Sequence, residues 1–132
     1  MSAELPAAYL DTVFILQDPP DPLPLAFAIV TAFNPMDEAQ SPDENWAADL
    51  RLQGRLAAVG WERFRATGCS PDQSHTEPGW AIVCPLDAAV DLARHFNQRA
   101  IWWIEHDQLH LIGCENPNPQ PVARFSDRVL PS

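Results

Sequence analysis

The sequence predicts an α+β fold with a ferredoxin-like βαββαβ core, in which a mainly antiparallel sheet carries both helices on one face. The apolar run over residues 25–33, broken only by Thr31, is typical of a central strand that is buried on both faces. Helical patterns follow over residues 42–59 and 85–96. From residue 25 the order is therefore strand, helix, strand, strand, helix, strand, and right-handed crossovers place both helices on the same face.

The first helix has clear start and stop signals. Ser41 can accept a hydrogen bond from the backbone N–H of Glu44, whose side chain can reach back to the N–H of Ser41. Pro42 occupies the first helical position, where its missing N–H costs nothing, and Gly60 is a natural C-terminal stop. These residues predict a capping box and a helix that ends at about residue 59.

The apolar side of this helix is less regular. The residues expected to face the sheet are Trp46, Leu50, Leu52, Leu56 and Ala57. Asp49 and Gln53 fall within the same arc, so the amphipathic pattern is imperfect.

The remaining elements extend this core within a single domain, residues 1–132. A short helical turn is expected at 7–10, further strands at 12–16, 61–67, 80–84, 100–104 and 109–112, and a loop at 68–79. The strands before and after the βαββαβ unit lengthen its sheet. The core is expected to cover about residues 9–114, and the proline-rich tail, residues 115–132, is expected to be irregular or packed on the surface.

Net charge and composition limit the classes of molecule that the protein is expected to bind. The net charge is −10, and the first 50 residues contain no Lys or Arg. Their acids are Glu4, Asp11, Asp18, Asp21, Asp37, Glu38, Asp43, Glu44 and Asp49. Such a surface repels phosphates, which argues against direct nucleic-acid binding, but it suits solubility, a basic partner or mimicry of DNA.

No membrane segment or cofactor site is predicted. The apolar runs are shorter than the roughly 20 residues that cross a bilayer, and the start has no basic region followed by an apolar run. Three widely spaced cysteines favour the cytoplasm. Glycine-rich phosphate loops and zinc motifs do not occur, so we expect no cofactor and no metal. Asp37, Glu38 and Asp43 leave a hard cation as an open alternative.

Part of the chain resembles a known family. Residues 30–35 contain a T-A-aromatic-N-P turn, residues 41–45 a Ser followed by Glu-Asn, and residues 96–101 a Gln after the second helix. Together with Glu77 these features resemble an uncharacterised bacterial family, domain of unknown function 3293. The resemblance implies no activity. It implies a short set of site positions, which are Thr31, Asn34, Asn45, Glu77 and Gln98.

The predicted topology brings these positions together. Asn34 ends the central strand, whereas Gln98 and Glu77 precede the strands expected on either side of it. Because both neighbours run antiparallel to the central strand, their starts lie at the end that carries Asn34. The amides and the carboxylate then either scaffold one another or recognise a ligand. His75 lies close to Glu77, and the two are the candidates for a catalytic base and its orienting partner.

Three functions remain open. The first is a binding or regulatory module that uses this polar patch, or its acidic face, against an unidentified protein or small ligand. The second is a small hydrolase-like enzyme that uses Glu77 with Asn34, Asn45 and Gln98. The third is an acidic inhibitor or DNA mimic, which requires the N-terminal acids to form one continuous face.

Overall fold

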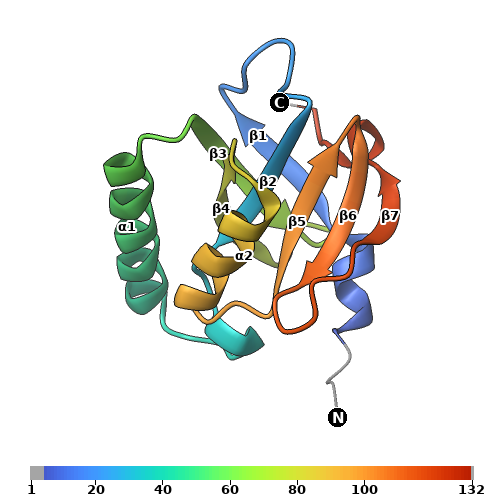
Figure 1. The fold of residues 1–132 in the computed structure, drawn as a ribbon. Coiled ribbons are helices and arrows are strands. Elements are labelled where there is room, and N and C mark those ends of the chain that lie inside the picture. Colours follow the sequence, from blue (N-terminus) through green and yellow to red (C-terminus); the bar gives the residue numbers. More distant parts are fainter. Residues whose placement is uncertain (1–4, 132) are drawn as a thin grey trace.

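The computed structural model describes residues 5–131, which form a mixed α/β fold with one curled, seven-stranded antiparallel sheet (Figure 1). The strand order is β1-β3-β4-β2-β5-β6-β7. The strands are β1 (Val13–Gln17), β2 (Ala26–Thr31), β3 (Arg63–Cys69), β4 (Thr76–Ile82), β5 (Ala100–Glu105), β6 (Gln108–Gly113) and β7 (Gln120–Arg124). The helices are α1 (Pro42–Val59) and α2 (Leu86–His95), with short 3₁₀ turns η1 (Ala7–Asp11), η2 (Pro35–Asp37) and η3 (Phe125–Arg128).

The strand β2 is central, as the apolar run predicts. It pairs antiparallel with β4 on one side and with β5 on the other. Phe27 and Ile29 face the concave side of the curled sheet, whereas Ala28 and Val30 face the two helices. Both faces of β2 are therefore covered, which explains why its sequence shows no polar alternation.

The helix α1 begins and ends as predicted, but its buried side differs. Ser41 and Glu44 form the capping box, and Gly60 caps the other end in a left-handed conformation. Trp46 and Leu50, which were expected to face the sheet, are 49% and 67% exposed, and Ala57, expected on the same side, is also exposed. That prediction was wrong because other positions on the helix turn toward the sheet.

Asp49 is the reason that the apolar pattern fails. Its side chain is almost fully buried, and its two carboxylate oxygens accept hydrogen bonds from Arg65 on β3 at 2.8 and 2.9 Å. The guanidinium of Arg65 also lies 3.9 Å from the centre of the Trp80 ring. A buried ion pair thus replaces an apolar contact beneath α1.

The strand β4 begins at Thr76, earlier than the expected start at residue 80. The sequence does not predict a strand at Pro78 and Gly79, because both residue types are uncommon in strand interiors. Gly79 is needed here, since a Cβ atom would lie 2.6 Å from the carbonyl oxygen of Val30. The loop between β3 and β4 is accordingly shorter than predicted, and Gly68 pairs with Glu77.

The proline-rich tail is part of the fold rather than irregular. It supplies β7 and η3, and Phe125 is fully buried beside Phe14 and Phe27. Val129 forms a parallel bridge with Phe14, and the N–H of Leu130 donates to the carbonyl oxygen of Phe14 at 2.8 Å. The tail therefore joins the β7 edge of the curled sheet to β1.

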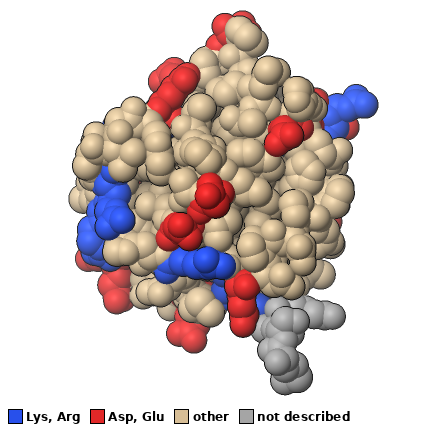
Figure 2. All heavy atoms as spheres, viewed as in Figure 1, with Lys and Arg blue, Asp and Glu red and all other residues tan. Residues whose placement is uncertain are grey.

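The described acids of the first 50 residues do not form one surface; Glu4 lies outside the described residues. Asp18 and Asp21 precede β2, the group from Asp37 to Glu44 follows it, and Asp49 is buried. The two exposed groups therefore lie at opposite ends of that strand. Figure 2 shows acidic side chains scattered over one face, with basic side chains between them. This distribution counts against the acidic mimic, which needs a continuous acidic face.

None of the helices within residues 5–131 has the length and apolar character needed to cross a membrane.

Candidate ligand-binding site

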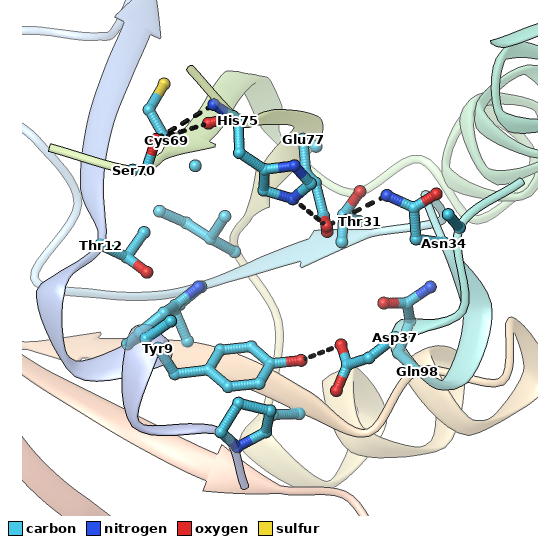
Figure 3. A pocket seen from close by; sticks show the side chains of 18 residues that line it. Tyr9, Thr12, Thr31, Asn34, Asp37, Cys69, Ser70, His75, Glu77 and Gln98 are labelled. Atoms are coloured by element: carbon cyan, nitrogen blue, oxygen red, sulfur yellow. Dashed lines mark hydrogen bonds and ion pairs between the residues drawn. The ribbon is translucent and has the colours of Figure 1, made fainter. Parts of the chain in front are cut away.

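A pocket of about 320 Å³ opens on the concave face of the sheet, where β2 ends (Figure 3). Ile29 of β2 and Ala100 and Trp102 of β5 supply its apolar wall. Tyr9 of η1 packs against Trp102 on the same wall. Small residues leave this space open, because Gly68 and Gly79 also line it and have no side chains to fill it.

Asn34 and Asn45 hold each other at the rim of this pocket. The N–H of Asn34 donates to Oδ1 of Asn45 at 2.8 Å, and Nδ2 of Asn45 donates to Oδ1 of Asn34 at 2.9 Å. The N–H of Gln40 also donates to Asn34 Oδ1, at 3.1 Å. Since its oxygen receives two donors, the amide of Asn34 has only one favourable orientation, with Nδ2 directed at Glu77.

Glu77 links the amide pair to His75. One oxygen, Oε2, lies 3.3 Å from Asn34 Nδ2 and 2.8 Å from His75 Nε2. An ionised carboxylate only accepts hydrogen bonds, so Nε2 of His75 carries the proton in this contact. The four side chains thus form one chain of hydrogen bonds, Asn45 to Asn34 to Glu77 to His75.

The loop between β3 and β4 places His75 beside this chain. The backbone N–H and the hydroxyl of Ser74, with the hydroxyl of Ser70, donate to the carboxylate of Asp72 and lower its pKa to about 2. The N–H of His75 donates to Ser70 Oγ at 3.0 Å. These local bonds order the turn that leads into β4.

Gln98 and Thr31 complete the predicted set. Nε2 of Gln98 donates to the carbonyl oxygens of Phe33 and Phe96, at 3.1 and 3.4 Å, and the residue is only 8% exposed. The hydroxyl of Thr31 donates to the carbonyl oxygen of Pro78 at 2.7 Å. Both residues therefore connect β2 to a neighbouring segment as well as lining the pocket.

The five positions meet at one rim, in agreement with the expectation from topology. Thr31, Asn34, Glu77 and Gln98 line the pocket, as does His75. Asn45 lies behind Asn34 and acts by holding its amide. Scaffolding and pocket lining therefore coexist in one network, and the ligand-binding and catalytic roles stay predictions.

Sequence reasoning missed a second polar group in the pocket. The hydroxyl of Tyr9 donates to Asp37 Oδ1 at 2.6 Å, and Arg99 Nη1 lies 3.1 Å from Asp37 Oδ2. Burial raises the pKa of Tyr9 well above its usual range, and the hydrogen bond to Asp37 raises it further. These residues lie far apart in the chain, so no local sequence motif predicts their contact.

The cation alternative gains no support from this arrangement. Both oxygens of Asp37 are engaged, by Tyr9 and by Arg99. Within residues 5–131 no group of three or more His, Cys, Asp or Glu side chains is placed to hold a metal ion.

The nucleophiles near the pocket are not activated. Burial raises the pKa of the Cys69 thiol, which disfavours the reactive thiolate. The hydroxyl of Ser70 donates at 2.8 Å to the carboxylate of Asp72, whose pKa of about 2 makes it too weak a base to activate the hydroxyl. A reaction at this site would therefore use an activated water molecule and not a covalent intermediate on Cys69 or Ser70.

The fold and this site define a mixed α/β protein with a small pocket at one end of a curled sheet. The chain belongs to the family described as "Protein of unknown function (DUF3293)", which it matches over residues 30–101. The matched region runs from β2 into β5 and includes the five rim residues. No curated protein and no solved structure matches the chain significantly.

Proposed function

We propose that this protein is a binding module whose pocket beside Asn34 and Glu77 takes a small molecule. The observation that carries the proposal is the pocket itself. Its volume of about 320 Å³ falls within the range of small-ligand sites, about 300–1,000 Å³. An apolar wall combined with a few convergent polar groups is also typical of such sites.

Rigidity supports the proposal. Asn34 is held by Asn45 and Gln40, and Gln98 is held by two backbone carbonyls. Polar groups that are fixed before a ligand arrives lose little freedom on binding, so more of the contact energy appears as affinity. A regulatory role would follow if the ligand also changed the surface around the η2 loop.

A fragment screen tests this proposal. The isotope-labelled protein is titrated with a chemically diverse fragment set, and its amide NMR resonances are followed. We expect saturable shifts that cluster at Thr31, Asn34, Gln98 and Trp102, because these residues line the pocket.

A pocket-filling variant provides the control. Ala100→Leu places a larger side chain in the cavity and should abolish these shifts. Ala57→Leu makes the same change on the exposed surface of α1 and should leave them unchanged. Shifts that lie elsewhere, or that survive Ala100→Leu, would contradict the proposal.

A second candidate function is general acid–base catalysis on a bound molecule. The contact of 2.8 Å between His75 and Glu77 favours it, since a carboxylate that orients an imidazole is a common arrangement for a base that activates water. In this hydrolase-like hypothesis His75 is the base and Glu77 orients it. Asn34 and Gln98 position the substrate.

An activity screen separates the two candidates. Purified protein is assayed against panels of chromogenic esters, amides and phosphoesters, with His75→Ala and Glu77→Gln as test variants. Catalysis predicts turnover that both variants lose, whereas His95→Ala, on the exposed surface of α2, retains it. If the protein binds a ligand but turns over none of the substrates in these panels, the binding module is the remaining candidate function.

We also propose a ferredoxin-like core and a cytoplasmic location. A ferredoxin-like core is supported by the order β3-β4-β2-β5 within the sheet and by the shared apolar cluster beneath α1 and α2. A cytoplasmic location is supported by three cysteines that form no disulfide among the described residues.

A further inference from the structure

This inference rests on the proposed small-ligand function and names the class of ligand. We infer that the pocket takes a small organic cation, a protonated amine carried on an apolar body. The argument comes from the hydrogen-bonding capacity that the protein itself leaves unused inside the pocket.

Gln98 leaves one acceptor free. Its Nε2 donates to the carbonyl oxygens of Phe33 and Phe96, and a flipped amide would place its oxygen against those same carbonyls. The orientation is therefore determined by the backbone. No group of residues 5–131 donates to Oε1, which Figure 3 shows turned toward the pocket. A polar atom of a side chain with 8% exposure gains from a donor on a ligand.

Glu77 leaves a second acceptor free. Asn34 and His75 both contact Oε2, and no group of residues 5–131 donates to Oε1. The side chain is 26% exposed and lines the same pocket as Gln98. A carboxylate in a partly enclosed site attracts a positive charge more strongly than one in open water does.

The charges around the pocket agree with a cation. The described residues that line the pocket include the two acids Asp37 and Glu77 but no Lys or Arg. Arg99 offsets Asp37 from outside the lining set, at 3.1 Å. Within residues 5–131 no Arg forms an ion pair with Glu77, so Glu77 is the group on which an ammonium would bind.

An apolar wall accounts for the rest of the ligand. The rings of Tyr9 and Trp102 lie 6.1 Å apart, centre to centre, and both line the pocket. Aromatic faces stabilise cations as well as apolar groups. A primary ammonium has several N–H donors, which matches the two free acceptors of Gln98 and Glu77.

Three matched probes test the class of ligand. The labelled protein is titrated with benzylamine, benzyl alcohol and benzoate, which share a ring and differ in charge. The side-chain amide of Gln98 and the indole N–H of Trp102 report binding. We expect benzylamine to bind about tenfold or more tightly than benzyl alcohol, and benzoate to bind weakest.

Two variants locate the effect. Glu77→Gln keeps the shape of the side chain and should weaken benzylamine about tenfold while changing benzyl alcohol little. Glu38→Gln removes the same charge from the exposed η2 loop, outside the pocket lining, and should leave both affinities nearly unchanged. The probe preference of the unmodified protein tests the inference even if Glu77→Gln folds poorly.

Equal or tighter binding of benzyl alcohol or benzoate at Gln98 and Trp102 overturns the cation inference and leaves the small-ligand function standing. An absence of shifts at these two residues with all three probes also overturns it. The diverse fragment set then decides separately whether the pocket binds ligands at all.

Discussion

Asn34 Nδ2 lies 3.3 Å from Glu77 Oε2, a contact that joins the end of β2 to the start of β4 across 43 residues of sequence. This bond is possible because Asn45, in the first turn of α1, occupies the oxygen of Asn34 and turns its nitrogen toward the carboxylate. A helix thus sets the orientation of a group in a pocket that the helix itself does not line.

Removing the side-chain amide of Asn45 should lower the stability of the fold. Asn45→Ala deletes two hydrogen bonds and leaves the N–H of Asn34 without its acceptor. We expect the free energy of unfolding to fall by about 1–3 kcal/mol. Urea denaturation measures this, and Gln53→Ala, at an exposed position on the same helix, should change it by less than about 0.5 kcal/mol. Equal effects of the two variants would show that the hydrogen bonds of Asn45 do not stabilise the fold.

The buried ion pair beneath α1 should behave as a unit. Asp49→Ala leaves the guanidinium of Arg65 beneath the helix without its carboxylate, so we expect a loss of about 3–5 kcal/mol. Replacing both residues by apolar ones, as in Asp49→Leu with Arg65→Met, should lose less than the sum of the single changes. Chemical denaturation of the unmodified protein, Asp49→Leu, Arg65→Met and the double variant forms a double-mutant cycle, and strictly additive losses would refute this coupling.

Tyr9 should make stability fall at alkaline pH. Burial and the hydrogen bond to Asp37 raise the pKa of Tyr9 in the folded protein. The unfolded chain releases the phenol proton near pH 10, so the contribution of Tyr9 is complete below about pH 10 and declines as the pH rises above it. Tyr9→Phe should remove this part of the decline.

Absorbance offers a direct measurement, because Tyr9 is the only tyrosine in the chain. Phenolate absorbance should appear together with unfolding and not before it as the pH is raised. An ordinary titration in the intact fold, with a midpoint near pH 10, would contradict the half-buried placement of Tyr9 and its hydrogen bond to Asp37.

Phe125 should be essential although it lies in the proline-rich tail. Its side chain is fully buried against Phe14 and Phe27, so Phe125→Ala should cost about 3–5 kcal/mol. Arg124→Ala, at the exposed neighbouring position, should cost less than about 0.5 kcal/mol. Thermal and urea unfolding measure both changes. A small loss for Phe125→Ala would mean that the tail packs only loosely.

Local signals in the sequence determined much of the fold. The capping box of Ser41 and Glu44, the stop at Gly60 and the apolar run of β2 act over a few residues, and each appears in the structure. The order of strands and helices then placed Asn34, Glu77 and Gln98 at one rim, since antiparallel neighbours bring their ends together.

Tertiary structure alone decided the rest. The burial of Asp49 depends on Arg65, the contact of Tyr9 with Asp37 spans 28 residues, and the place of Phe125 depends on how far the sheet curls. None of these contacts has a local pattern, because each becomes favourable only when distant segments already surround it. Short-range hydrogen bonding and periodicity can be predicted from neighbouring residues in the sequence. The charge and shape of the pocket are determined only when distant segments come together.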